Sequence, residues 1–242
     1  MAFSHTFGEG TSDYEKYIRT QDLYRLQKTP DQWANEEELL FQVIHQAMEL
    51  WLKVVIQHCE QSTQWIAQEN LHEAARFLGR SAGILRWLAD SLEFPRSMAP
   101  WDYHKIRMGL GQGSGQESPT YKALHKAVPP IGAAFAGLLK KHSLTADQVH
   151  QDRTRHQGMY DLMFAMVQFD QELMHWKYRH FQLVKRIIGD AVMSLKGVPA
   201  SSLKDTCHEA QFPDLWTVIN RTTGAYNEKF RPKGGGGYAA TK

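Results

Sequence analysis

Cysteine is scarce in this chain of 242 residues, and neither of its two cysteines belongs to a CxxC pair. Cys59 and Cys207 lie far apart in the sequence, which excludes a four-cysteine zinc or iron–sulfur site and is typical of a reducing compartment. The motif CxxCH is absent as well, so any heme would be held without thioether bonds. Cys59 could serve as a thiolate ligand, although it lies in the polar stretch IQHCEQS.

A large net charge and long apolar runs are also missing. The 28 basic and 26 acidic residues give a net charge of +2, so no electrostatic footprint points to nucleic acid. The N-terminus has no apolar core of the signal-peptide type, and no apolar run is long enough to span a bilayer. Because 42% of the residues are hydrophobic, we expect a globular protein. From the small net charge and the missing apolar segments, we expect it to be soluble and cytoplasmic and to bind neither nucleic acid nor membranes.

Strand-like alternation and internal repeats are absent, whereas helical periodicity runs along most of the chain. The sequence therefore predicts an all-α fold, with one helical bundle over residues 13–230 and flexible ends at 1–12 and 231–242. Segments 109–119 and 197–213 are predicted to be loops. The predicted helices cover 13–27, 35–61, 69–92, 101–108, 119–141, 158–196 and 213–224.

The segment 35–61 predicts a mostly buried helix, because its apolar side chains cover a wide arc rather than a narrow stripe. His45 follows Phe41 by one turn and lies at the edge of this arc, on the face of Met48 and Leu52. The arc comprises Leu40, Val43, Ile44, Ala47, Met48, Trp51, Val54 and Val55.

A second histidine, His180, lies in the middle of an apolar stripe on the segment 158–196, whereas His175 belongs to a face expected to be exposed. Inward histidines on two long helices are typical of an axial heme ligand and a distal-pocket base. Alternatively, each is a core histidine that bonds a backbone carbonyl. The other members of the stripe are Leu162, Met166, Phe169, Leu173, Trp176, Val184 and Ile187.

A di-iron site is a competing interpretation. Glu69-x-x-His72 and Glu172-x-x-His175 match the Glu-x-x-His spacing of ferritin-like bundles. Both pairs lie on polar faces or near a helix start, however, and two further inward glutamates are hard to find. The spacing is short and common by chance, so it supports this site only weakly.

The glycine-rich stretch GLGQGSGQESP (109–119) could suggest a phosphate loop. It has neither a preceding strand nor a Gly-Lys-Ser/Thr ending, so that interpretation is weak. Arg107 stands just before this stretch, with Tyr103 one turn earlier. Such an arginine can bind a substrate carboxylate through its fork of donors, or it can be an ordinary surface residue.

Four segments form a pattern that is more specific than any one of them: SDYEKYIRTQDLYRLQ (12–27), EELLFQVIHQAMELWLK (37–53), MAPWDYHKIRMGLGQGSG (98–115) and WKYRHFQLVKRIIG (176–189). In this order they resemble four parts of the tryptophan 2,3-dioxygenases. These are the N-terminal segment, the distal helix, the stretch with the carboxylate-binding arginine, and the helix with the proximal heme histidine. The resemblance implies a single-domain helical bundle that binds heme and oxygenates an aromatic substrate with O₂.

The resemblance also implies a role for each matching residue. His180 corresponds to the axial ligand of a b-type heme (iron protoporphyrin IX), and His45 to the distal histidine near the indole nitrogen. Phe41 corresponds to the aromatic wall of the pocket. The groups at the substrate carboxylate and in the adjoining loop correspond to Tyr103, Arg107 and Ser114.

The N-terminal match implies an oligomer. Tyr14, Tyr17 and Ile18 correspond to residues that reach into a neighbouring subunit's site in this homotetrameric family. We therefore expect a homo-oligomer, of tetramer type, whose small-molecule partners are O₂ and an aromatic amino acid.

Two loops depart from the family's pattern, both at the amino-acid end of the substrate. After the proximal helix the family carries Gly-Thr-Gly-Gly-Ser-Ser-Gly, whereas this chain has KGVPASSLKD (196–205), with Val198 or Pro199 at the place of the ammonium-binding threonine. The other loop is GSGQES (113–118) where the family has Ser-Gly-Phe-Gln-Ser. We expect oxygen insertion into the indole ring of L-tryptophan or a modified tryptophan. Two alternatives stay open: monooxygenation of an aromatic amino acid in secondary metabolism, and a non-catalytic heme-binding protein.

Overall fold

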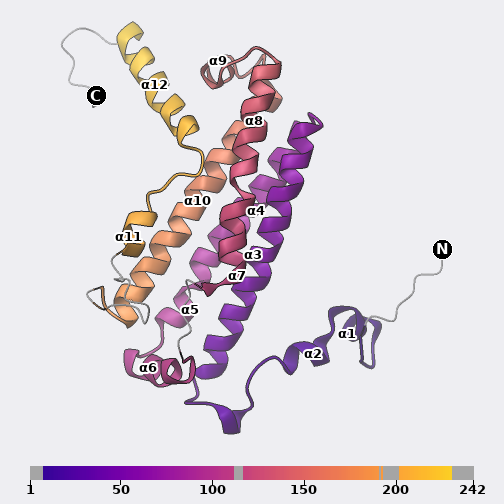
Figure 1. The fold of residues 1–242 in the computed structure, drawn as a ribbon, viewed down its shortest axis with the longest axis vertical. Coiled ribbons are helices and arrows are strands. Elements are labelled where there is room, and N and C mark those ends of the chain that lie inside the picture. Colours follow the sequence, from indigo (N-terminus) through magenta and orange to yellow (C-terminus); the bar gives the residue numbers. More distant parts are fainter. Residues whose placement is uncertain (1–7, 112–116, 191, 193–201, 231–242) are drawn as a thin grey trace.

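Three long helices form the frame of the molecule, and each corresponds to a segment of helical periodicity in the sequence. They are α3 (Glu38–Ala67), α4 (Leu71–Ser91) and α10 (Gln157–Ile187). The computed structural model describes residues 8–111, 117–190, 192 and 202–230. Within these residues all regular secondary structure is helical, which confirms the predicted all-α class (Figure 1).

The core lies where α4 contacts both α3 and α10, and these two contacts are the most extensive between the described elements. Leu78, Leu85 and Leu88 of α4 have no exposed surface. Leu162 and Phe169, from the predicted stripe of α10, are also fully buried. Each such side chain stabilises the fold by about 1.5–3 kcal/mol relative to leaving it exposed, so apolar packing on α4 holds the frame together.

Shorter helices cover the frame and connect its ends. α5 (Glu93–Arg96) and α6 (Pro100–Gly109) follow α4. α7 (Pro119–Ala127) and α8 (Pro129–Lys141) pack along α3, while α9 (Ala146–Gln151), α11 (Ser202–Thr206) and α12 (Pro213–Phe230) contact α10.

Several boundaries differ from those predicted. The predicted helix 119–141 is two helices, because Pro129 and Pro130 cannot continue α7 and instead begin α8. α10 ends well before residue 196, and Gly189 follows it with a left-handed φ of 96°. α11 lies inside the predicted loop 197–213, and α9 lies between two predicted helices.

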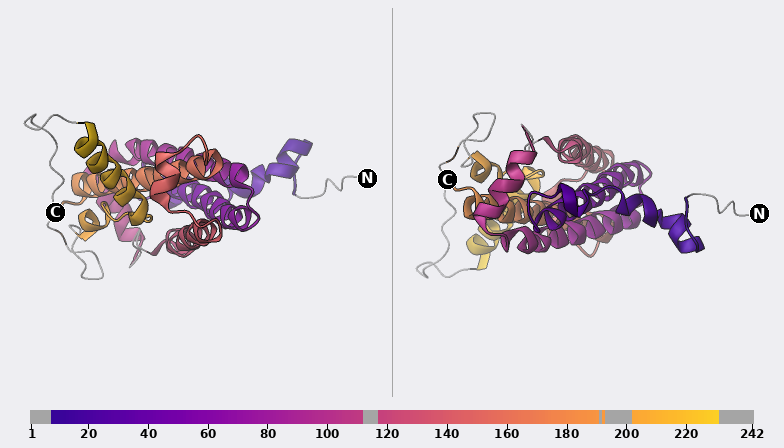
Figure 2. Two further views of the ribbon diagram at one scale, coloured as in Figure 1. Left: turned by 90° about the horizontal axis from the view of Figure 1, so that it is seen from above. Right: turned by 90° about the horizontal axis from the view of Figure 1, so that it is seen from below.

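An N-terminal arm extends away from the bundle and carries α1 (Asp13–Ile18) and α2 (Thr20–Tyr24) (Figures 1 and 2). Ser12 caps α1 through a capping box with Glu15. The predicted helix 13–27 is nevertheless broken in two, because Arg19 adopts a left-handed backbone conformation with φ of 58°. The predicted flexible ends lie largely outside the described residues.

α3 is less buried than its sequence predicts. Val43, Trp51 and Val54 belong to the predicted buried arc but are exposed, because the helices that contact α3 leave part of that arc uncovered. By length and composition, α3 alone among the described helices could cross a membrane. In this molecule α3 is a frame helix that packs against α4, α7 and α8.

Candidate functional site

Two histidines on separate frame helices, His45 on α3 and His180 on α10, lie near enough that a charge on His45 affects the protonation of His180. The pKa of His180 is lowered to about 4, because burial removes hydration from the charged ring and because charge on His45 repels it. Burial also lowers the pKa of His45, although its side chain remains accessible to small molecules. An imidazole at the bottom of an open recess combines a lowered pKa with an accessible side chain. At neutral pH both rings are therefore uncharged.

His180 has the properties that an iron ligand requires. Its ring is partly accessible and has no hydrogen-bond partner among the described residues. A neutral imidazole without a partner keeps a nitrogen lone pair free for a metal, so the residue is suited to hold a heme iron. The alternative of a core histidine bonded to a backbone carbonyl does not apply to His180 within the described part of the chain.

His45 is held in one orientation by Phe41, one turn earlier on α3. Its Nδ1 lies 2.7 Å from the Phe41 carbonyl oxygen, and the centroids of the two rings are 4.1 Å apart. Because a carbonyl oxygen only accepts hydrogen bonds, Nδ1 carries the proton and Nε2 keeps its lone pair. Nε2 of His45 can therefore accept a hydrogen bond from an N–H group of a ligand.

Helix α6 brings Tyr103 and Arg107 to the same region. The rings of Phe41 and Tyr103 lie with their centroids 6.1 Å apart. Burial raises the pKa of Tyr103, and the nearby positive charge of Arg107 opposes this shift. Asn35 links the two elements, because its Nδ2 donates a hydrogen bond of 2.9 Å to the carbonyl oxygen of Asp102. α3 and α6 together present aromatic rings, an imidazole and a guanidinium group.

Arg107 is half-buried and has no carboxylate partner among the described residues. Its guanidinium stays charged and presents donors in a planar fork that matches a carboxylate. Because a partly desolvated charge without a partner is costly, this position favours an anionic ligand over an ordinary surface role.

Glu49, one turn after His45, is a site residue that the sequence analysis did not single out. Its carboxylate accepts hydrogen bonds from the hydroxyl of Ser118 and, at 2.6 Å, from Oγ1 of Thr120. Ser118, near the end of the glycine-rich stretch, also caps α7. Glu49 therefore fixes the point at which that stretch rejoins the bundle. Its spacing of four residues from His45 is the signal that could have identified it.

Three residues from the sequence analysis, Ser114, Val198 and Pro199, lie outside the described residues. The structure thus brings together Phe41, His45, Tyr103, Arg107 and His180.

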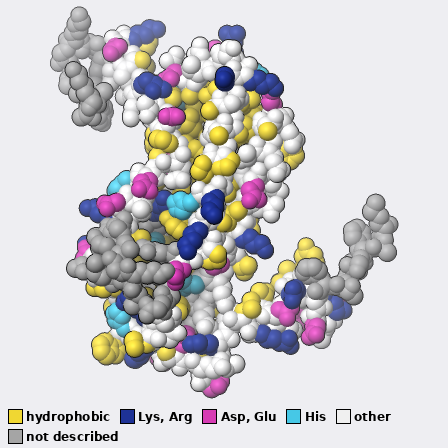
Figure 3. All heavy atoms as spheres, in the orientation of Figure 1, with side chains coloured by type: hydrophobic (Ala, Val, Ile, Leu, Met, Phe, Trp, Pro, Cys, Tyr) yellow, Lys and Arg dark blue, Asp and Glu magenta, His cyan; other side chains and the backbone are white. Residues whose placement is uncertain are grey.

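The three N-terminal residues do not join this group within one subunit. Tyr14 and Tyr17 are 71% and 76% exposed on α1, and Ile18 is exposed as well. Figure 3 shows the arm standing off the main body of the molecule. Aromatic side chains of this size at a protruding position are available for contact with another chain.

The competing di-iron interpretation gains no support. Glu69 binds Lys141 and His142 at 2.5 and 2.8 Å. Glu172, predicted to be exposed, is buried and bonds Arg86 at 2.6 Å, because α4 brings that cation to its face of α10. Within the described residues, no three histidine, cysteine or acidic side chains are grouped so that they could hold a metal ion.

A thiolate of Cys59 is also the wrong expectation for an iron ligand. The residue is fully buried in the core, and burial raises the pKa of its thiol to about 12. The polar stretch around it is partly buried as well, since His58 and Ser62 lie in the interior. Both cysteines are free thiols.

Comparison with known proteins gives one consistent result. The family model described as tryptophan 2,3-dioxygenase matches residues 2–129, which is more than half of the chain. The tryptophan 2,3-dioxygenase of Erythrobacter litoralis is 27% identical over 234 residues, covering 75% of this chain and 88% of the relative. The Bacillus thuringiensis protein of the same name is 25% identical, with 88% and 94% covered. The corresponding protein of Myxococcus xanthus is 23% identical, with 88% and 91% covered.

Proposed function

This chain belongs to the tryptophan 2,3-dioxygenase family, and from that premise we infer that it is a heme-dependent oxidoreductase that inserts oxygen from O₂ into the indole ring of tryptophan or a modified tryptophan. One observation in the structure carries the inference. His45 of α3 acts on the buried imidazole of His180 of α10, in a region that also receives an aromatic wall and a guanidinium without a carboxylate partner among the described residues. Such a region suits an aromatic amino acid beside a metal-bound cofactor.

His180 is the proposed axial ligand of the heme iron. Because its pKa is lowered to about 4, no proton occupies its ring lone pair at neutral pH. The heme is proposed to be b-type, since the chain has no CxxCH motif for thioether bonds. When bound, this cofactor supplies the activation of O₂.

Four side chains are proposed to position the substrate. Arg107 binds the carboxylate through two parallel N–H···O bonds, with Tyr103 beside it. Phe41 packs against the indole ring, and Nε2 of His45 accepts a hydrogen bond from the indole N–H. The protein thus contributes orientation and exclusion of water, which lower the barrier by holding the reactants in a productive geometry.

We propose that the exposed aromatic residues of α1 complete the site of a neighbouring subunit in a homotetramer. The support is that Tyr14 and Tyr17 are three residues apart on a helix, share a face, and have no covering partner within the described residues of their own subunit.

The number of oxygen atoms inserted depends on the altered loop. Valine and proline at positions 198 and 199 cannot supply a hydroxyl group to the substrate ammonium, and proline also fixes its own φ. We propose dioxygenation, with ring opening to an N-formylkynurenine-type product, as the main reaction. This substitution favours monooxygenation as the second candidate, because loose capture of the ammonium group changes how the ring is presented.

The test combines the heme spectrum with the mass of the product. The heme-loaded protein should show a Soret band and convert L-tryptophan or β-methyltryptophan to a product heavier by two oxygen atoms. A gain of one oxygen would support the second candidate. His180→Ala should lose the Soret band, whereas His175→Ala, an exposed change five residues earlier on the same helix, should keep it. An unchanged spectrum in His180→Ala, or no turnover of any aromatic substrate, would contradict the proposal.

A further inference from the structure

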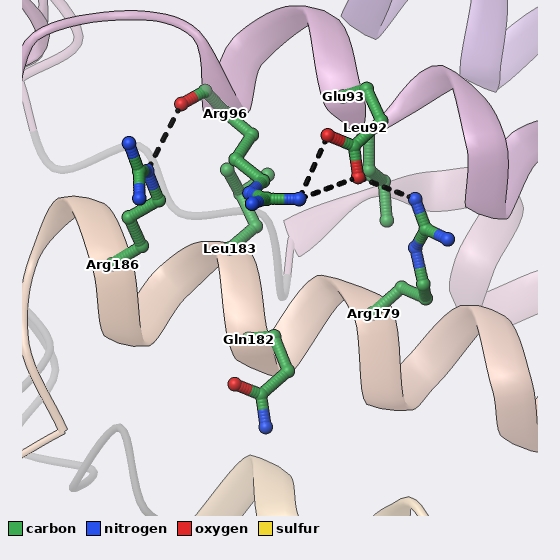
Figure 4. Close-up of a pocket in the computed structure, with 7 residues that line it drawn as sticks. All are labelled: Leu92, Glu93, Arg96, Arg179, Gln182, Leu183 and Arg186. Atoms are coloured by element: carbon green, nitrogen blue, oxygen red, sulfur yellow. Dashed lines mark hydrogen bonds and ion pairs between the residues drawn. The ribbon is translucent and has the colours of Figure 1, made fainter.

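A pocket of about 430 Å³ lies between α5 and α10, and none of the candidate site residues lines it. This volume falls within the range of small-molecule sites. Its side chains come from the end of α4, from α5 and from the second half of α10 (Figure 4). The residues that matter for its chemistry are Leu92, Glu93, Arg96, Arg179, Leu183 and Arg186.

Positive charge dominates this pocket, because three guanidinium groups meet one lining carboxylate. Glu93 binds Arg96 at 2.9 Å and Arg179 at 2.6 Å, and Figure 4 shows the two arginines on opposite sides of it. Asp90 also approaches Arg179, at 3.7 Å, but from outside the pocket. Even with Asp90 counted, one positive charge is left unmatched.

Arg186 is the unmatched cation. Its Nε donates a 3.2 Å hydrogen bond to the backbone carbonyl of Arg96, and no carboxylate among the described residues pairs with it. This bond holds the guanidinium beside α5 and leaves its two terminal nitrogens free. Arg96 likewise uses one terminal nitrogen for Glu93 and keeps other donors free. Free forks of donors on neighbouring arginines suit a group with several oxygen acceptors.

The pocket also has an apolar part. Leu92 is buried and Leu183 is half-buried, and both line the same cavity as the arginines. A bare inorganic ion would leave this surface in contact with water, whereas an organic ligand would cover it. The occupant that matches both parts carries compact negative charge at one end and an apolar body at the other.

We propose that this pocket binds a small organic phosphate monoester, with the phosphate between Arg96 and Arg186 and the apolar body against Leu92 and Leu183. A phosphate dianion offers three oxygens to several guanidinium donors at once, which a single carboxylate does not. None of the residues that line this pocket belongs to the proposed heme and substrate site, and Arg179 and Arg186 project about 100° or more around α10 from His180. The proposal therefore does not depend on the proposed function.

The experiment measures binding of phenyl phosphate to the heme-loaded protein by isothermal titration calorimetry. Inorganic phosphate and phenol are the comparison ligands, because each carries one half of the proposed recognition. We expect phenyl phosphate to bind at least about tenfold more tightly than either of them. Equal affinity for phenyl phosphate and phenol would overturn the anion site, and equal affinity for phenyl phosphate and inorganic phosphate would overturn the apolar part.

Two arginine variants separate the pocket from general surface charge. Arg186→Gln removes the free guanidinium and should weaken phenyl phosphate binding by about tenfold or more, which is the loss of one charge-assisted interaction. The matched control is Arg153→Gln, an exposed arginine between α9 and α10 that does not line the pocket, and its affinity should equal that of the unmodified protein. Both variants should keep the heme spectrum, which verifies folding. Equal affinity in the two variants, or no binding by the unmodified protein, would overturn the proposal.

Discussion

Asp170 of α10 links the frame to the C-terminal part of the chain. It has no exposed surface, and its carboxylate accepts hydrogen bonds from three donors. The backbone N–H of Gln211 lies 2.9 Å from both oxygens, while the N–H of Phe212 and Nε1 of Trp216 lie 3.1 and 2.9 Å from Oδ2. These bonds anchor the segment that follows the altered loop and begins α12.

We expect Asp170→Ala to lower the free energy of unfolding by about 3–5 kcal/mol. Hydrogen bonds to a charged group contribute about 1.5–3 kcal/mol each, and their losses are not additive when the donors share one acceptor. The change also removes a negative charge that favours the buried ammonium of Lys177, whose pKa burial lowers. For a chain of this size the loss corresponds to a fall of roughly 6–20 °C in Tm.

Asp170→Asn provides the matched comparison. An asparagine that places its carbonyl oxygen at the position of Oδ2 keeps the bonds from Phe212 and Trp216, but its amide group then faces the N–H of Gln211. We expect it to cost less than the alanine change. The second control, Asp161→Ala, alters an exposed carboxylate on the same helix and should change stability by less than about 0.5 kcal/mol.

The assay is thermal and urea unfolding followed by circular dichroism and tryptophan fluorescence. Equal stability of Asp170→Ala and Asp161→Ala would refute the reasoning, since it would mean that the buried carboxylate contributes nothing beyond a surface one. Equal losses in the alanine and asparagine variants would refute the assignment of the three donors.

Four further predictions concern the candidate site and the thiols. Arg107→Leu should raise the apparent KM for the substrate by roughly 30-fold or more with heme content intact, because a carboxylate loses a bidentate partner contributing about 2–4 kcal/mol; an unchanged KM would return Arg107 to a surface role. Glu49→Gln should keep the Soret band but lower kcat/KM, since it weakens the bonds that fix the start of α7; unchanged kinetics would contradict its positioning role. Cys59 and Cys207 should not react with a disulfide reagent at pH 8 until the protein is unfolded, because burial raises the pKa of both thiols; fast labelling of the native protein would contradict the buried core. Deleting residues 1–20 should impair oligomerisation and turnover together while heme is partly retained, and a fully active monomer would show that subunits do not share sites.

The sequence predicted the frame helices well, because each buries apolar residues at helical spacing against a neighbour. The stripe on α10 is the clearest case: Leu162, Phe169 and Trp176 are all buried where periodicity placed them. Periodicity does not show which part of an apolar helix face is covered by neighbouring helices. Val43 and Trp51 are as apolar as their buried neighbours on α3, but they are exposed, since coverage depends on which helices pack against α3.

Helical periodicity did not predict the short helix α11 or the break at Arg19, and each has its own physical reason. α11 spans little more than one turn, which is too short for an apolar period to be recognised. The break at Arg19 depends on a left-handed backbone that arginine rarely adopts, so the residue type gave no warning.

Two sequence signals identified residues of the candidate site: helical periodicity for His180 and position before a glycine-rich stretch for Arg107. Periodicity alone placed His180 on an inward face but could not distinguish a ligand from a packed core residue. In the structure the ring is partly accessible, its pKa is lowered, and it has no partner in the described part of the chain, which supports the proposed ligand role. For Arg107, the structure adds that the side chain is half-buried, and a partly desolvated guanidinium favours an anionic ligand.

The pocket lined by Arg96, Arg179 and Arg186 could not be predicted from sequence patterns. Arg96 and Arg186 are 90 residues apart in the sequence, and no motif connects them. Their proximity follows from the contact between α10 and α5, the short helix that comes directly after α4. Sites built from one helix face or one loop are therefore within reach of sequence reasoning. A site assembled from charged residues of two distant segments requires the fold, because its chemistry exists only once the two backbones are brought together.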